Sequence, residues 1–331
     1  MTRRLLLLIV CLFMAVSAMA ETAPLYTGQL RTGAPLFTNP DGNAEQVTML
    51  TAGSRVQILE VWPGWLLVRD KAERTGYVQR SRLSDTSVLP LDPAKTPAYS
   101  TVPCGFLAWV SDKAAVREEP HELAKELTLL HHGARLALID IENGWARVIY
   151  HRQYGYINTN QLSEIIPFNL AEAPGDDSPV AAYTSFYKTS TDASNLNRII
   201  NLKVACDRMA QHTFFSGDRL DFNRQIGPYS RSNGYLTANV LVKGEVVQGY
   251  GGGTCQVSST LYNVVLQLPG LGVVYRRAHG PAAASYLPHG ADAAVGSDTQ
   301  NFIIQNNYPY PIRIDGSAQD GALTIAIYRA D

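Results

Sequence analysis

The sequence has little cysteine, no excess of basic charge and few long apolar runs. Its 331 residues include four cysteines, and none belongs to a Cys-x-x-Cys pair, which argues against a cysteine-rich zinc site. The 28 lysines and arginines are balanced by 29 aspartates and glutamates, so no basic field argues for nucleic-acid binding. After the first twenty residues no segment is apolar enough to span a membrane. The composition predicts a folded globular protein, and no cofactor is expected.

The first residues have the pattern of a secretory signal peptide. Arg3 and Arg4 precede the apolar run 5–16, and Ala18-Met19-Ala20 is a small-residue cleavage site. We therefore expect residues 1–20 to be removed and the protein to be exported to the periplasm or the cell surface, without stable membrane insertion. A retained N-terminal anchor is the alternative. The sequence carries no signal for an oligomeric state.

An internal repeat occupies the first half of the chain. Residues 48–84 resemble residues 128–163, with Gly-Trp at 64–65 matching 144–145 and Gly-Tyr-Val at 76–78 matching Gly-Tyr-Ile at 155–157. Alternating apolar and polar residues between turn signals predict two small antiparallel β-barrels. Both copies resemble bacterial SH3 domains, over residues 25–84 and 105–163. That resemblance implies weak binding to the cell wall, with Trp65 and Trp145 as candidate contacts. The alternative, which we favour, is that both tryptophans pack in the core or at the rim of the barrel.

Proline-rich segments separate three domains. Residues 85–104 and 164–180 are rich in proline and small residues, which oppose packing and predict linkers. The remainder, residues 181–331, begins with a predicted strand at 182–187 and a helical pattern at 196–211. Its tail, from 302 to 328, alternates as two or three strands do. The fold class is therefore two small all-β barrels followed by an α+β domain.

One cysteine lies where a glycine-rich turn meets a helix. The turn Gly251-Gly252-Gly253-Thr254-Cys255-Gln256 precedes apolar residues at helical spacing. A thiol at a helix N-terminus is favoured as thiolate, the nucleophilic form; a buried structural cysteine is the alternative. After signal cleavage Cys104, Cys206 and Cys255 remain, and an odd count leaves at least one free thiol. Cys104 and Cys206 could pair, but Cys206 sits in a helical pattern that favours a core position.

Partners for this thiol lie downstream in a loop rich in proline and glycine. His279 or His289 could act as base and Asp292 could orient the imidazole, with Arg276 and Arg277 in support. The backbone N–H groups of residues 254–256 could form an oxyanion site. Two histidines and an aspartate also permit a metal site, but their spacing matches no metal motif, so none is predicted.

Three stretches together resemble the VanW family. They are FSGDRLDFNRQIGPYSRSNGY, then GYGGGTCQVSSTLYNVVLQLPGLGVVYRRAHGPAAASYLPHGADAAV, then NFIIQNNYPYPIRI, within about residues 181–328. The resemblance implies Cys255, His279 and Asp292 as catalytic residues, whereas His289 falls at a variable position. It also implies a set of substrate-binding residues: Gly252, Gly253, Thr254, Gln256, Arg277 and Tyr286. The sequence departs from the family at Gly280, often serine, and at Gln300-Asn301-Phe302, where an acidic residue often stands.

Members of this family have been assigned as L,D-transpeptidases, which cross-link peptidoglycan stem peptides. The resemblance implies that Cys255 attacks a stem-peptide carbonyl, expels the terminal D-residue and forms a thioester that a neighbouring amine resolves, with His279 as base and then acid. Transfer to water would make a carboxypeptidase. The alternative is a non-catalytic peptidoglycan-binding or glycopeptide-resistance accessory protein, in which the cysteine serves packing.

Overall fold

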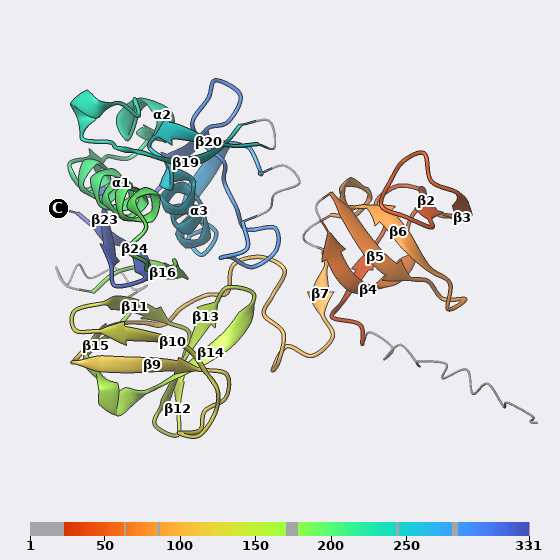
Figure 1. Ribbon diagram of the computed structural model, residues 1–331, viewed down its shortest axis with the longest axis horizontal. Helices are drawn as coiled ribbons and strands as arrows, with labels where there is room; N and C mark the ends of the chain where they lie inside the picture. Colours follow the sequence, from red (N-terminus) through yellow and green to blue (C-terminus); the bar gives the residue numbers. More distant parts are fainter. Residues whose placement is uncertain are drawn as a thin grey trace, which may run out of the picture.

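The computed structural model describes residues 23–62, 64–84, 87–169, 178–242, 245–279 and 284–330 (Figure 1). The predicted signal peptide lies outside these residues. No helix in the described ranges is both long and apolar enough to cross a membrane. We call residues 25–84 module 1, residues 105–163 module 2 and residues 181–331 the C-terminal domain. Module 1 stands to one side in Figure 1, and module 2 lies beneath the C-terminal domain.

Module 1 is a single antiparallel sheet with a core of its own. Its strand order is β3-β2-β6-β5-β4-β1-β7, so β3 and β7 are edges and the predicted closed barrel is an open sheet in the described residues. Strand β7 follows module 1 in the chain. It pairs with β1 on the side that β4 leaves free, and so extends the sheet beyond the module. Alternate residues along the strands are buried, as the repeat predicted. The strands are β1 (Tyr26–Gln29), β2 (Ala34–Phe37), β3 (Gln46–Leu50), β4 (Arg55–Trp62), β5 (Trp65–Arg69), β6 (Thr75–Gln79) and β7 (Leu89–Pro90), with the short helix η1 (Arg80–Arg82).

Module 2 divides its strands between two sheets. One has the order β10-β9-β14-β13-β12 and the other β11-β8-β15. The hairpin of β13 and β14 repeats the pairing of β5 and β6, as the sequence repeat requires. Whether this copy is a second SH3 domain stays a prediction. The strands are β8 (Phe106–Val110), β9 (Lys113–Arg117), β10 (Glu126–His131), β11 (Arg135–Leu138), β12 (Ile141–Glu142), β13 (Trp145–Tyr150), β14 (Gln153–Asn158) and β15 (Leu162–Pro167), with η3 (Thr159–Gln161).

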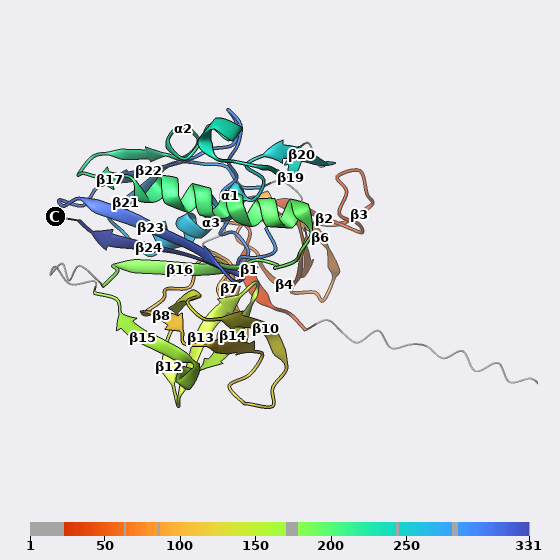
Figure 2. The ribbon, with the colours of Figure 1, turned by 60° about the vertical axis from the view of Figure 1, so that its left-hand side comes forward.

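The C-terminal domain has the expected α+β character. Helix α1 lies across the sheet β16-β24-β23-β17, and α3 packs against β16 and β24 (Figure 2). The predicted strand, helices and alternating tail are all present, with bounds shifted by a few residues. The elements are β16 (Ala181–Phe186), α1 (Ala193–Ala210), β17 (Thr213–Phe214), β18 (Arg219–Asp221), α2 (Phe222–Gln225), η4 (Arg231–Asn233), β19 (Thr237–Val242), β20 (Glu245–Tyr250), α3 (Thr254–Val265), β21 (Leu271–Arg276), β22 (Phe302–Asn306), β23 (Ile312–Gln319) and β24 (Ala322–Arg329).

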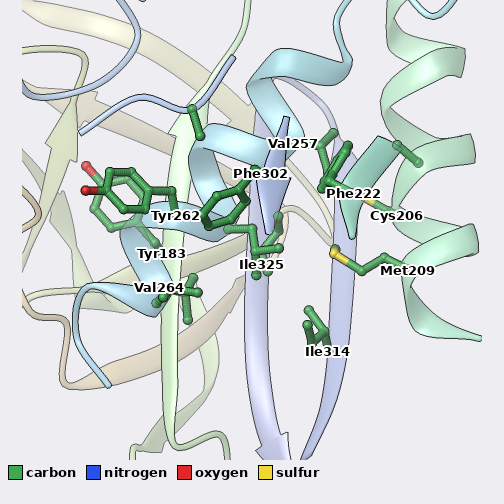
Figure 3. Packing of buried hydrophobic residues seen from close by; sticks show 14 of the residues in the cluster. Tyr183, Cys206, Met209, Phe222, Val257, Tyr262, Val264, Phe302, Ile314 and Ile325 are labelled. Carbon is green, nitrogen blue, oxygen red and sulfur yellow. The ribbon is translucent and has the colours of Figure 1, made fainter. Parts of the chain in front are cut away.

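The core of this domain lies between the two helices and the sheet. Side chains from α1, α3 and β24 meet there, among them Met209, Val257 and Ile325 (Figure 3). Cys206 is buried in this core, and Cys104, Cys206 and Cys255 are all free, so the possible bridge between Cys104 and Cys206 is not formed. Burial raises the pKa of both Cys104 and Cys206 to about 12, which keeps their thiols protonated and unreactive.

The linker between the modules runs along the C-terminal domain. Tyr99 is buried in the core of module 1 and stacks on His289, with ring centroids 5.8 Å apart. Farther along, the Thr101 hydroxyl donates to the carbonyl oxygen of Asn263 at 2.9 Å, and the Cys104 N–H donates to Gln267 Oε1 at 3.0 Å. The predicted linker is therefore held by specific hydrogen bonds to α3 and to Gln267 just beyond it, unlike a free tether.

Candidate active site

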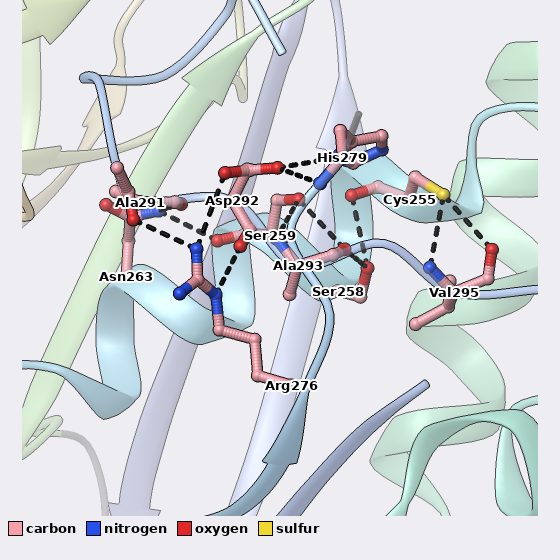
Figure 4. A network of polar contacts seen from close by, with 11 residues as sticks. Cys255, Ser258, Ser259, Asn263, Arg276, His279, Ala291, Asp292, Ala293 and Val295 are labelled. Carbon is pink, nitrogen blue, oxygen red and sulfur yellow. Dashed lines mark hydrogen bonds and ion pairs between the residues drawn. The ribbon is translucent and has the colours of Figure 1, made fainter. Parts of the chain in front are cut away.

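The nucleophile candidate occupies the position the sequence predicted, at the first turn of α3. Gly253 precedes this helix with φ +108°, a conformation that side chains other than glycine rarely adopt. Cys255 is half-buried, and its Sγ bonds both main-chain groups of Val295: it donates to the carbonyl oxygen at 3.3 Å and accepts from the N–H at 3.4 Å. The thiol is thus fixed between the helix start and the loop that follows Asp292 (Figure 4).

A histidine–aspartate pair lies beside this thiol. His279 Nδ1 is 2.7 Å from Asp292 Oδ2, and the His279 N–H donates to the same oxygen at 2.6 Å. Because Asp292 engages Nδ1, Nε2 is the ring nitrogen left for Cys255. Burial lowers the pKa of His279, but the interactions with Asp292 and the Cys255 thiol outweigh it and raise that pKa to about 10. The imidazole therefore holds its proton at neutral pH.

Asp292 is itself held in its charged form. Burial acts to raise its pKa, but the hydrogen bonds from His279 and the charge of Arg276 lower it. Arg276 Nη2 lies 3.5 Å from Asp292 Oδ1, its Nε donates to the Asp292 carbonyl at 2.6 Å, and its guanidinium lies 4.5 Å from the ring centroid of Tyr262. Of the two adjacent arginines it is Arg276 that supports the acid, whereas the Arg277 side chain is exposed.

Hydroxyl and amide groups of α3 hold the aspartate loop in register. Ser258 Oγ donates to the Ala293 carbonyl at 2.6 Å, and Ser259 Oγ accepts from the Ala293 N–H at 2.9 Å. One turn later, Asn263 Nδ2 donates to the carbonyl of Ala291 at 2.7 Å. The polar side chains in the SSTLYN stretch thus fix the backbone on both sides of Asp292. The signal in the sequence for this role was a run of polar residues within a predicted helix, and in the structure these residues are buried.

The predicted oxyanion donors are only partly available. The Thr254 N–H donates to the Gly251 carbonyl at 3.0 Å, and the Gln256 N–H donates to the Gly253 carbonyl at 2.8 Å. The N–H of Cys255 makes no such bond within the described ranges. The prediction of three backbone donors thus reduces to one, because the tight turn itself uses the other two.

The other predicted binding residues divide between the site and the interior. Tyr286 is half-buried beside Cys255, and burial and that neighbour raise its pKa. Gln256 is buried, and its amide donates to Ser185 Oγ at 2.9 Å and to the Phe186 carbonyl at 3.2 Å, so its side chain faces the interior. His289 lies against module 1, away from the His279–Asp292 pair, as its variable position in the motif suggested.

Trp65 and Trp145 both lie in the β modules. Trp65 packs edge-on against Phe37, with ring centroids 5.7 Å apart. Trp145 starts β13 and is half-buried. Their binding to the cell wall stays a prediction.

Three residues at the site were not singled out from the sequence. Tyr229 is a neighbour of Cys255, and burial and that thiol raise its pKa. The Tyr229 hydroxyl donates to Asn223 Oδ1 at 3.0 Å, and Asn223 in turn bonds the loop after Val295. Arg198 reaches from α1 to Gln256. Arg198 shares the helical stripe of the buried Leu202, Ala205 and Met209, and a charged residue in such a stripe was the available signal.

No group of three or more metal-ligating side chains is assembled anywhere in the described part of the chain.

Comparison with known proteins adds an independent line of evidence. Residues 197–328 match the family model described as VanW like protein, and residues 32–84 match the model for a bacterial SH3 domain. An uncharacterized protein of Bacillus subtilis strain 168, YoaR, is 36% identical over 183 residues, covering 54% of this chain. The match spans 60% of that relative's own length.

The solved structures found to be similar are distant. NlpC1 from Trichomonas vaginalis is 13% identical, with coverage of 98% of this chain and 99% of its own and a TM-score of 0.19. An NlpC/P60 family protein from Bacillus cereus is 14% identical, covering 46% of this chain and 60% of its own, with a TM-score of 0.16. These scores do not establish a shared fold. The family models do identify two domains: a VanW like domain over residues 197–328 and a bacterial SH3 domain over residues 32–84.

Proposed function

We propose that this protein is an exported cell-wall enzyme, a cysteine-dependent peptidoglycan L,D-transpeptidase. The observation that carries the proposal is the pairing of Cys255, at the start of α3, with a histidine that Asp292 holds protonated. An imidazolium beside a thiol at a helix N-terminus is the environment that favours the thiolate. The VanW like domain and the SH3 domain agree with work at the cell wall.

The residues divide the reaction into two transfers. The Cys255 thiolate attacks the carbonyl carbon that precedes the terminal D-residue, and the developing oxyanion faces the free N–H of Cys255. As the carbon–nitrogen bond breaks, His279 gives its proton to the leaving amine, which leaves a thioester on Cys255. The amine of a second stem peptide then attacks the thioester and loses its proton to the imidazole. The new amide forms, the carbon–sulfur bond breaks and the cysteine is regenerated.

Each neighbour has one task in this scheme. Asp292 keeps His279 in one tautomer and stabilises its positive charge, and Arg276 holds Asp292 charged. The thiolate forms when the thiol proton passes to Nε2 of His279, and the sulfur then stops donating to the Val295 carbonyl, its acceptor in the thiol form. As thiolate, the sulfur can no longer donate to that oxygen but can still accept from the Val295 N–H.

The test is mass spectrometry of the intact protein with a disaccharide-tetrapeptide. We expect an acyl adduct on Cys255 with loss of the terminal D-residue, and no adduct on Cys255→Ala. Cys104→Ala is the matched control. It should still be acylated on Cys255, because the Cys104 thiol that it removes is buried and protonated and takes no part in the reaction. Asp292→Asn should slow acylation by about 10²- to 10⁴-fold.

Two results would contradict the proposal. If Cys255→Ala supports full cross-linking, the nucleophile is wrong. If the unchanged protein binds the muropeptide and never forms an adduct, the protein is a binding module. Supplying water as the only acceptor separates carboxypeptidase from transpeptidase activity.

A further inference from the structure

An arginine at the edge of the site has no acidic partner among the described residues. Arg198 projects from α1 towards the first turn of α3, where a Cβ at Gly253 would lie 2.8 Å from Arg198 Cγ. Its guanidinium donates to Gln256 Oε1. No carboxylate of a described residue forms an ion pair with it, and the side-chain acceptor that it does contact is a neutral amide oxygen.

The orientation of that amide is fixed by other contacts. The Nε2 group of Gln256 donates to Ser185 Oγ and to the Phe186 carbonyl, which forces Oε1 to face Arg198. The arginine is therefore held in place by a buried side chain while most of its five N–H donors remain available. A guanidinium so oriented is suited to a bidentate contact with a planar anion.

Burial makes this charge costly without a counter-ion. Loss of hydration lowers the pKa of Arg198, and the nearby Tyr286 and Tyr187 oppose that shift. A partly buried charge needs an opposite charge to offset its lost hydration. The chain supplies one to Arg276, through Asp292, but none to Arg198 within the described residues.

Arg198 and the nucleophile also have a common neighbour. Tyr286 is a neighbour of Arg198 and of Cys255, and Gln256 directly follows Cys255 in α3. An anion on Arg198 would thus lie beside the thiol and next to the positive end of the α3 dipole.

We propose that Arg198 is the anchor for a carboxylate of the peptide substrate, placed beside Cys255 by Gln256 and Tyr286. The inference rests on the proposed function, because it names the group that this site recognises. A stem peptide offers its terminal carboxylate and a side-chain carboxylate. The terminal one would confine the enzyme to peptides that end one residue after the bond it cleaves.

Binding measurements on the full chain with Cys255→Ala test this without relying on catalysis. Three ligands are titrated calorimetrically: the disaccharide-tetrapeptide, its terminal amide and its side-chain amide. We expect one of the two amides to bind about 10- to 100-fold more weakly, as for loss of a charge-assisted bidentate contact, and that amide identifies the carboxylate. In the same background Arg198→Gln should bind all three peptides alike, and Arg198→Lys should keep part of the discrimination.

Lys203→Gln is the matched control. It removes one positive charge from the exposed face of the same helix and should leave the discrimination unchanged. An unchanged unfolding midpoint shows that each variant is folded, and Arg198→Lys carries the test if Arg198→Gln is not. The proposal is overturned if both amides bind as tightly as the free acid, if the free acid does not bind, or if Arg198→Gln still discriminates.

The outcome also separates this inference from the proposed function. Carboxylate-dependent binding without an adduct on Cys255 would retain the anchor and reject the enzyme. Equal acylation by the acid and both amides would retain the enzyme and reject the anchor.

Discussion

Modules 1 and 2 have similar sequences but are attached to the C-terminal domain in different ways. Module 2 shares its interior with that domain: Leu107 and Ala137 cluster with Ala182 and Ala326. Module 1 keeps a separate core and meets the domain mainly through the linker and the ring stack of Tyr99 on His289. The repeat therefore accounts for the hairpin that the two copies have in common, whereas individual residues such as Leu107 and Ala137 decide whether a copy becomes part of a larger core.

Deleting each module should give the largest contrast. Removing residues 1–96 should leave a protein that unfolds in one cooperative transition, because module 2 and the C-terminal domain keep their common core. Removing residues 1–167 exposes the apolar face of β16 and β24, so this truncation should be insoluble or lack a cooperative transition. Thermal unfolding followed by circular dichroism decides between these outcomes. Equal cooperativity of the two truncations would show that module 2 is as independent as module 1.

A single ion pair tests the shared interface more finely. Arg135 in module 2 is buried and pairs with Asp315 on β23. Arg135→Ala leaves that carboxylate without its partner, and because the Asp315 side chain is 36% exposed the free energy of unfolding should fall by about 2 kcal/mol. Denaturant titration measures the change. Arg55→Ala, at an exposed position of module 1, should change the free energy of unfolding by no more than about 0.5 kcal/mol. A similar loss in both variants would show that the ion pair between Arg135 and Asp315 is not the cause.

Alanine variants of two glycines distinguish the effect of backbone strain from the effect of a displaced linker. Gly290 has φ +85°, and a Cβ there would lie 2.7 Å from the Tyr99 carbonyl oxygen, whereas Gly144 has φ +79° with nothing within 4 Å. Both alanine variants carry the strain of a left-handed residue, about 1 kcal/mol, but only Gly290→Ala collides with the linker and should cost about 2 kcal/mol. Limited proteolysis within residues 87–103 should therefore be faster in Gly290→Ala alone. Equal rates in the two variants would mean that the linker does not depend on this contact.

Mild acid should weaken the attachment of module 1, and this effect should be smaller than those of the variants above. Burial, followed by the charges of Arg152 and Arg80, lowers the pKa of His289 to about 3. A base with a lowered folded pKa stabilises the fold above its unfolded pKa, about 6.5, and that contribution is lost as the pH falls from 6.5 towards 3. Between pH 6.5 and pH 5 we expect a loss of about 1 kcal/mol, since the ring is partly exposed. Linker proteolysis at pH 7 and pH 5 reports it.

His289→Gln is the control for that measurement. It keeps a polar side chain without the titration, so its cleavage rate should no longer change between the two pH values. Persistence of the acid effect in this variant would assign it to another group.

The sequence predicted the parts of the site that are close together in the chain. Cys255 follows a glycine turn and His279 precedes Asp292 by a short loop, so local patterns and the family motif were enough to pair them. Arg198 was missed because only the packing of α1 on α3 brings it to the site. Gln256 was expected to face the substrate, but its amide satisfies buried groups of β16.

The fold shows the same division between local and distant information. Alternation and helical spacing predicted the first strand and the first helix of the C-terminal domain to within a few residues, and the all-β character of the two modules. The open sheet of module 1 was not predicted, because β7 pairs with β1 from beyond the repeat. The shared core of module 2 was not predicted either, since it joins residues far apart in the chain.

The hydrogen bonds of the linker have a consequence for what the protein can select. Thr101 and Cys104 fasten the chain to α3 and to Gln267 just beyond it, and Cys255 lies in the first turn of that helix. The separation between module 1 and the thiol is therefore set by the fold, not by the reach of a flexible tether. A ligand that touches both must match that separation, so the molecule discriminates among ligands by length as well as by chemistry.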